Sequence, residues 1–448
     1  MNLLKLSFSY LRRRWLNTLL NVLLLSFGIA TIVVLLLFSY QVEDNLYKNA
    51  EGVDVVVGAK GSPIQLILSS IFHIDAPTGN IDLHEAKELM ENSAVREAIP
   101  LALGDNYRGY RIVGTTTGYI EKYGGDLAAG RLWDQEFEVV AGAAVAAAEG
   151  LAVGDTFVSS HGFDGGGHTH DDHDLVVVGV LEPTGTVLDR LLLTGVETMW
   201  GIHEHNSDHE HDDEHSDDGH HHHDNDHDHN NHEDSETVAD GGHSQDGHNH
   251  SRGRDITDSS YLSDQYGDEQ ITSMLIRYSN PLAAAQFPRF VNAETNMQAA
   301  APAVEITRLL GLLGVGLDAI EIFAYILILA SILGIFIAMI NSMKERKYDL
   351  AIMRTLGGSR YKLFVHVILE GVLVALAGTL LGLGLGHAAV EGIGMMMAEA
   401  QQFDITGRII IPGEARILLL AILVGVIAAL IPAIRAYRTD IAHTLSKS

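Results

Sequence analysis

Cysteine is absent from the 448 residues of this sequence, which excludes disulfide bonds and thiolate metal sites. Basic residues are scarce, because 29 lysines and arginines stand against 58 aspartates and glutamates, for a formal net charge of -29. A chain with this balance lacks the positive surface that nucleic-acid phosphates require, so no nucleic acid is expected as a partner.

Catalytic signatures are also missing, and the chain is expected to be non-catalytic. The zinc-peptidase pattern His-Glu-x-x-His does not occur, because the His-Glu pairs at His203, His209 and His232 lack a second histidine at the required spacing. No Gly-x-Ser-x-Gly or Walker motif is present. Residues 58–62, Gly-Ala-Lys-Gly-Ser, resemble the end of a phosphate loop but fail its spacing, which predicts a glycine-rich turn without nucleotide.

Four long apolar runs contain no charged residue: 15–40, 322–343, 371–390 and 417–434. Each is close to the ~20 residues that cross a bilayer as a helix. Buried helices of a soluble protein are the alternative, and for the first run a signal peptide is another. The first run has 26 residues, which exceeds the ~7–15 of a signal-peptide core. Four transmembrane helices are therefore predicted.

Basic residues mark one side of the predicted spans. Thirteen lysines and arginines, with only three acidic residues among them, lie in 1–15, 344–362 and 434–448. Because cytoplasmic flanks retain positive charge, both termini are predicted to be cytoplasmic in a multi-pass protein of the inner membrane. The predicted order is cytoplasmic N-terminus 1–14, first span 15–40, extracytoplasmic domain 41–318, second span 319–343, cytoplasmic loop 344–362, third span 365–390, short outer loop 391–416, fourth span 417–434 and cytoplasmic tail 435–448.

The extracytoplasmic domain is predicted to be mixed α/β. A helix is predicted over residues 82–92 behind an Asp82 cap, and another is expected to open at Asn280-Pro281. The predicted fold class is thus a membrane protein with one span, a large inserted α/β domain and three further spans. Runs rich in Val and Ile predict strands at 53–57, 110–114, 137–140, 156–159, 175–181 and 271–278.

Histidine is concentrated in a tract within the predicted outer domain. Residues 203–250 contain fifteen histidines and sixteen acidic residues but no lysine or arginine, which predicts a disordered loop. Imidazole is a common ligand of zinc, copper and nickel, so metal capture is favoured over a merely solvating acidic insert. The candidate ligands there are His203, His205, His209, His211, His215, His220, His221, His222, His223, His227 and His229.

A shorter cluster consists of His161, His168, His170 and His173. It lies in the loop of a predicted hairpin between the strands at 156–159 and 175–181, and strands can hold ligands in fixed positions. Three or four imidazoles from one ordered loop would suit a zinc site, whereas an exposed polar turn is the alternative. Zinc, or another divalent transition metal, is the expected cofactor.

The predicted cytoplasmic loop reads Met-Lys-Glu-Arg-Lys-Tyr-Asp-Leu-Ala-Ile-Met-Arg-Thr-Leu-Gly-Gly-Ser-Arg over residues 343–360. Its apolar residues share one helix face, Gly357-Gly358 can end that helix and Ser359 can cap the next. A generic amphipathic helix at the membrane surface is the alternative reading.

This stretch resembles the signature of the MacB/FtsX-type ABC transporter permeases, the type VII or mechanotransmission class. Residues 431–442, Ile-Pro-Ala-Ile-Arg-Ala-Tyr-Arg-Thr-Asp-Ile-Ala, resemble the second signature of that family. The resemblance implies that a separate cytoplasmic ATPase dimer docks on the loop and moves the spans and the outer domain. The implied coupling residues are Glu345, Arg346, Asp349, Leu350, Met353, Arg354, Leu356 and Gly357.

The resemblance also implies two copies of the chain, and Gly378, Gly382 and Gly386 in the third span form a small-residue face suited to close helix packing. Three functions remain open: a permease for divalent metal handling; the same machine acting on a lipoprotein, lipid or peptide; and a membrane-anchored metal receptor without an ATPase. Membrane lipids and an extracytoplasmic metal-binding or cargo protein are further expected partners.

Overall fold

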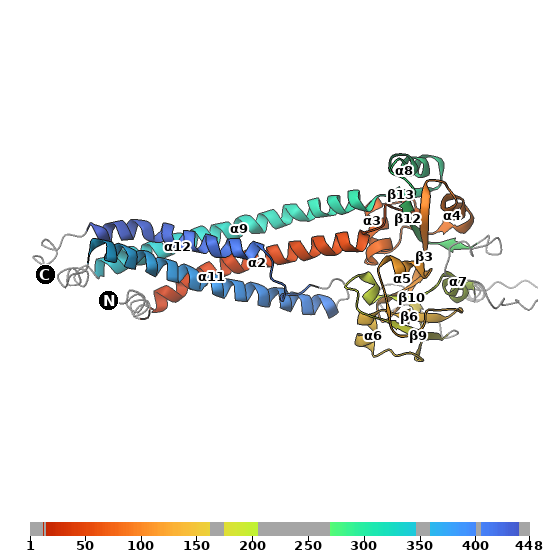
Figure 1. Cartoon of the computed structure of the whole chain (residues 1–448), viewed down its shortest axis with the longest axis horizontal. Helices are drawn as coiled ribbons and strands as arrows, with labels where there is room; N and C mark the ends of the chain where they lie inside the picture. Colours follow the sequence, from red (N-terminus) through yellow and green to blue (C-terminus); the bar gives the residue numbers. More distant parts are fainter. Residues whose placement is uncertain are drawn as a thin grey trace, which may run out of the picture. The chain divides into compact units, whose positions relative to one another are not determined.

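The computed structural model describes residues 12, 15–161, 174–204, 269–345, 359–399 and 405–438. The chain divides into two compact units (Figure 1). The helical unit comprises Met1–Thr78, Gly185–Val187 and Asn280–Ser448. The sheet unit comprises Gly79–Thr184 and Leu188–Ser279.

Four long helices dominate the helical unit and run side by side in Figure 1. They are α2 (Trp15–Ala50), α9 (Pro302–Glu345), α11 (Arg360–Glu399) and α12 (Gly413–Tyr437). All four are long and apolar enough to cross a membrane, which confirms the predicted order of one span followed by three. At about 1.5 Å per residue, α2 and α9 are much longer than the ~30 Å hydrocarbon layer.

The rest of the helical unit is a small α/β assembly. Strands β1 (Val55–Ala59) and β13 (Met297–Ala300) pair antiparallel, and the short helices α3 (Pro63–Ile67), η1 (Leu68–Phe72) and α8 (Ala283–Glu294) accompany them.

A predicted turn and a predicted helix start can be compared with this assembly. Gly58 and Ala59 still belong to β1, so the turn predicted over 58–62 is confined to the residues after them, where the Gly61 N–H donates to Gln298 Oε1 at 2.8 Å and Ser62 caps α3. The helix expected to open at Asn280-Pro281 begins later, at Ala283. The Asn280 side chain instead accepts a hydrogen bond from the Ala283 N–H at 3.1 Å, which closes a turn before the helix.

The sheet unit contains a mixed sheet. Its strands follow the order β12 (Ser273–Tyr278), β3 (Val95–Tyr107), β4 (Tyr110–Thr115), β10 (Leu192–Gly195), β6 (Glu138–Ala141), β9 (Leu175–Leu181) and β5 (Leu127–Gly130). The β10/β4 and β6/β9 pairs are parallel and the other pairs along this path are antiparallel. Strand β7 (Thr156–Phe157) pairs with β9, β8 (Ser160–His161) with β3, and β11 (Gln270–Ile271) with β2 (Ile81–Asp82).

Helices α4 (Leu83–Met90), α5 (Gly118–Lys122), α6 (Ala143–Glu149) and α7 (Val196–Glu204) complete the sheet unit. The Asp82 side chain caps α4, as predicted, by accepting from the N–H groups of His84 and Glu85. The predicted mixed α/β fold between the first and second spans is therefore confirmed.

Candidate functional site

The three predicted packing glycines of α11 all face α2 of the same chain. A Cβ built on Gly378 would come 3.0 Å from Leu25 Cβ, one on Gly382 would come 2.7 Å from Ile29 Cβ, and one on Gly386 would come 2.7 Å from Val33 Cβ. Both helices advance by four residues between contacts, so they run parallel in a constant register. The stripe lets the two backbones approach more closely than any larger side chain would allow.

A second pair of glycines joins α11 to α12. A Cβ on Gly371 would lie 2.7 Å from Ala429 Cβ, and one on Gly425 would lie 2.7 Å from Val372 Cα. A further contact joins α2 to α9, because a Cβ built on Gly28 would come 3.1 Å from Ile328 Cγ1. Close glycine contacts thus join all four spans, and of these glycines only Gly378, Gly382 and Gly386 were predicted from the sequence as packing residues.

Two buried ionisable residues lie near the start of α11. His366 is 2% exposed and Glu370 is 8% exposed. They continue the four-residue spacing of the glycine stripe back toward the predicted coupling loop. Ionisable side chains inside spans are costly and commonly mark functional positions. Neither residue was predicted as a site, although a histidine and a glutamate next to a long apolar run can be recognised in the sequence as candidate functional residues.

The predicted ATPase-coupling residues lie at and beyond the end of α9. Glu345 is the last residue of that helix. Ser359 is the next residue that the structure describes. It caps α11, as predicted, because its Oγ accepts from the Lys362 N–H at 3.3 Å. The other coupling residues, Arg346, Asp349, Leu350, Met353, Arg354, Leu356 and Gly357, lie outside the described residues.

Most of the predicted metal ligands also lie outside the described residues, in 162–173 and 205–268. His161 ends β8 and His203 belongs to the last turn of α7. In the parts of the chain that the structure describes, no three His, Asp or Glu side chains are grouped as a metal site requires.

The structure describes the residues at which two histidine segments join the fold: the shorter segment, 162–173, and the longer segment, 205–268. The shorter segment follows β8, whose His161 pairs with Asp105 of β3. The longer one returns at β11 and leads to Thr272, whose N–H donates to Leu101 O at 2.8 Å and whose Oγ1 accepts from the Leu103 N–H at 2.9 Å.

The shorter segment leaves the fold at an edge of β3, and the longer one returns through β11, which pairs with β2, to Thr272 on that same edge of β3. Strand β4 occupies the opposite edge, since Asn106 pairs with Arg111 on one side and with Ser160 on the other. Strand β8 runs antiparallel to β3, so its end points toward Thr272. Only two positions of β3, about 7 Å along the strand, separate Leu103 from Asp105.

The ends of the longer segment are also held together. The indole N–H of Trp200 on α7 donates to the Gln270 carbonyl on β11 at 2.8 Å. Residue 269, just before β11, accepts a hydrogen bond from the Leu83 N–H at 2.9 Å. The chain therefore leaves and re-enters the sheet unit at one fixed place.

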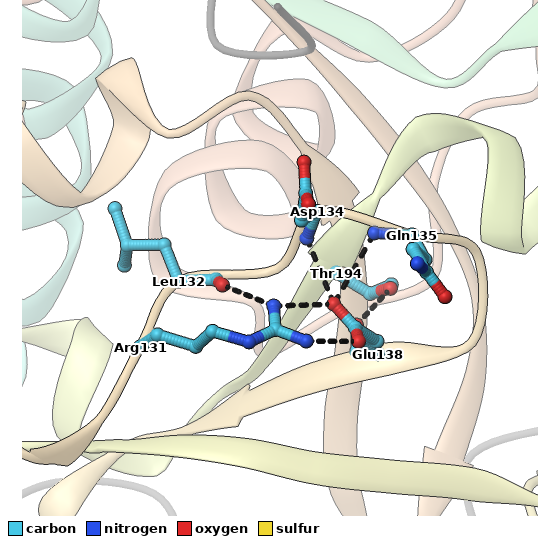
Figure 2. A network of polar contacts seen from close by, with 6 residues as sticks. All are labelled: Arg131, Leu132, Asp134, Gln135, Glu138 and Thr194. Carbon is cyan, nitrogen blue, oxygen red and sulfur yellow. Dashed lines mark hydrogen bonds and ion pairs between the residues drawn. The ribbon is translucent and has the colours of Figure 1, made fainter. Parts of the chain in front are cut away.

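Figure 2 shows a polar network in the loop between β5 and β6. Both terminal nitrogens of Arg131 donate to the Glu138 carboxylate, which also accepts from the N–H groups of Asp134 at 2.8 Å and Gln135 at 3.2 Å. Burial alone raises the pKa of Glu138, but these donors lower it, and the net pKa lies below its ordinary value. The carboxylate is held ionised in a structural clamp and is no candidate proton donor.

Comparisons with known proteins match both halves of this architecture. The model for the MacB-like periplasmic core domain matches residues 18–213, and the model for the FtsX-like permease C-terminal domain matches residues 321–441. Together they include well over half of the 448 residues. No curated protein matches the chain.

Two solved structures are similar at low identity. The periplasmic region of MacB from Actinobacillus actinomycetemcomitans is 12% identical, with 59% of this chain and 97% of that chain covered and a TM-score of 0.31. The extracellular domain of the noncanonic ABC-type transporter YknZ from Gram-positive bacteria is 9% identical, with 55% and 98% covered and a TM-score of 0.26. Both TM-scores are below 0.5, so the assignment rests on the two family models. With these models in the predicted order and four apolar helices around an α/β domain, the chain belongs to the MacB/FtsX-type ABC transporter permeases.

Proposed function

We propose that this permease subunit couples ATP hydrolysis by a separate cytoplasmic ATPase dimer to movement of its outer α/β domain, in a machine that handles zinc. It acts as two copies in the inner membrane with both termini cytoplasmic. The family assignment supports the ATPase partner and a non-catalytic role, and the thirteen basic residues of the flanks and loop support the orientation.

The observation that carries the zinc proposal is that the shorter histidine cluster begins, and the longer histidine segment returns, near the same edge of β3. The shorter cluster begins at an edge of β3, where His161 pairs with Asp105, and the chain returns from the tract of fifteen histidines through β11 to Thr272 on that same edge. Tethering ligands at one place raises their effective concentration around a shared ion. Imidazole and carboxylate are ligands that zinc prefers, and the tract and the shorter cluster supply nineteen histidines beside many carboxylates. A merely solvating loop would not require histidine.

The first experiment measures zinc binding to the purified full chain by isothermal titration calorimetry. Micromolar binding is expected, with a clear loss when His161, His168, His170 and His173 are all changed to Ala. A matched control changes the exposed His84 of α4, which belongs to neither histidine segment. Absence of binding at micromolar zinc would reject the metal part of the proposal and leave the permease assignment intact.

The second experiment tests the ATPase partner and separates the alternatives. The permease and a candidate ABC ATPase from the same cell are co-purified, and ATP hydrolysis is measured with and without zinc. Leu356→Asp is expected to break the complex, and failure of any ATPase to co-purify would favour a metal receptor without an ATPase. Unchanged transport activity after deletion of residues 203–250 would favour a lipoprotein, lipid or peptide cargo.

A further inference from the structure

Six side chains tie the loop between α11 and α12 to three of the spans. We call this group the loop latch: Gln41 on α2, His387 and Glu391 on α11, Thr406 and Arg408 in the loop, and Glu414 on α12. The Gln41 amide makes two bonds to one loop residue. Its Nε2 donates to Thr406 O at 3.0 Å, and its Oε1 accepts from the Thr406 N–H at 2.8 Å.

Glu391 holds the next part of the loop. Its Oε2 accepts from Thr406 Oγ1 and from the Gly407 N–H, both at 2.9 Å, and its Oε1 lies 2.9 Å from Arg408 Nη2. The loop packs tightly against α11 at Gly407, because a Cβ on this glycine would overlap the carbonyl oxygen of His387. The charge of Glu391 is thus balanced by Arg408.

His387 forms the third attachment, and its geometry places one hydrogen on Nδ1. Its Nδ1 lies 2.5 Å from Gly407 O. A carbonyl oxygen can only accept, so Nδ1 carries a hydrogen. The other ring nitrogen, Nε2, lies 3.3 Å from Glu414 Oε2. Glu414 Oε1 accepts from the Ile411 N–H at 3.0 Å, so this carboxyl group also holds the end of the loop.

A neutral imidazole with its hydrogen on Nδ1 presents a lone pair at Nε2. An ionised carboxylate opposite that lone pair would leave two acceptors facing each other without a hydrogen between them. The contact therefore requires one more proton, carried either by Nε2 or by Oε2. We infer that the loop latch is a proton-dependent device, closed while the His387–Glu414 pair holds this proton and opened when the proton is lost.

The other charged groups around the pair do not replace that proton. Glu391 on α11 is engaged by Arg408 of the loop, α2 contributes the neutral amide of Gln41, and the Nη2 of Arg416 on α12 lies 3.9 Å from a Cβ built on Gly413, whereas the ion pair of Glu414 is with His387. The side chains of His387 and Glu414 are 22% and 12% exposed, so the pair is not sealed inside the protein. The inference depends on neither zinc nor the ATPase.

Pulsed electron-spin measurements test this directly, because the chain has no cysteine of its own. Spin labels are attached to cysteines that replace Ile410 in the loop and Tyr47 on α2, which are 79% and 46% exposed. The full chain is placed in lipid nanodiscs at about pH 6 and about pH 9, on either side of the range in which histidine titrates. One narrow distance is expected at the lower pH, and a second, longer population is expected at the higher pH.

Two matched variants separate the proton from general loosening. In Glu414→Gln the amide N–H donates to neutral Nε2 and the amide oxygen still accepts from Ile411, so one narrow distance is expected at both pH values. Glu43→Gln removes an exposed carboxylate of α2 that is outside the loop latch, so the pH response is expected to remain. Circular dichroism and size-exclusion profiles equal to those of the parent show that each variant is folded.

Two outcomes would overturn the inference. The parent chain would show the same single distance at both pH values, or the Glu414→Gln variant would open at high pH to the same extent as the parent. If Glu414→Gln fails to fold, His387→Gln takes its place. Its amide can donate to Gly407 O without a titrating ring, so it is expected to abolish the pH response, and a retained response would equally overturn the inference.

Discussion

Gly382 of α11 lies directly against Ile29 of α2, because a Cβ on this glycine would come 2.7 Å from the Ile29 Cβ and 2.8 Å from the Ser26 carbonyl oxygen. This contact is the middle one of three that set the register of the two helices.

Gly382→Ala is therefore expected to destabilise the helix bundle by roughly 1–3 kcal/mol, as overpacking of a tight core does. Gly384→Ala is the matched control, since a Cβ there meets nothing within 4 Å in the part of the chain that the structure describes. Thermal unfolding of both variants in detergent measures the difference. Equal melting temperatures for the two would show that the close contact is absent in solution.

Trp200→Phe is expected to loosen the base of the long histidine segment. It removes the hydrogen bond to the Gln270 carbonyl, a bond of this type being worth about 1 kcal/mol. Amide hydrogen exchange should become faster at Gln270 and Ile271 and stay unchanged in β9. Trp15→Phe serves as the control, because Trp15 is 64% exposed.

Glu138→Gln is expected to reduce the sensitivity of the sheet unit to acid. The folded pKa of Glu138 lies below its ordinary value, so the folded state binds this proton less readily than the unfolded chain does. The stabilisation is complete above the ordinary carboxyl pKa of about 4.3 and is lost as the pH falls through the lower folded value.

Melting temperatures of the parent and of Glu138→Gln, measured from about pH 6 down to about pH 3, test this expectation. The parent should lose stability more steeply over that range. Glu136→Gln, at an exposed position two residues away, should follow the parent. Parallel curves for parent and Glu138→Gln would contradict the prediction.

Zinc is expected to raise the melting temperature of the full chain, because a ligand that binds the folded state preferentially stabilises it by mass action. At about one hundred times the dissociation constant the gain is about 2.7 kcal/mol. Deletion of residues 203–250 should reduce the shift, and added chelator should abolish it. An unchanged melting temperature with zinc present would argue that the histidines bind no ion in the folded chain.

The sequence predicted those features that depend on local pattern. Four uncharged runs predicted the four spans, and residues 175–181, Leu-Val-Val-Val-Gly-Val-Leu, predicted β9, in which buried and half-buried side chains alternate. Strand β3 was missed because Pro100 and Gly104 lie within it, and both residue types usually argue against a strand interior. Strand β5 was missed because Leu-Ala-Ala-Gly lacks the branched residues that signal a strand.

Features that depend on distant partners could not be predicted. Gln41 and Thr406 are separated by 365 positions, and nothing near either residue indicates the other. His387 and Glu414 each read as an ordinary polar residue at the end of an apolar run. The glycine stripe of α11 was visible as a spacing, but its partner, the Leu25 side of α2, became known only from the packing.

The bond between Trp200 and Gln270 has a consequence for how this chain can vary. The entropy of closing a loop rises slowly with length, by about 0.6 kcal/mol for each doubling. Since the fold fastens both ends of the insertion at its base, the sheet unit is nearly indifferent to how many residues lie between them. The length of this segment and its number of histidines can therefore change, in evolution or by design, with little effect on the stability of the sheet unit.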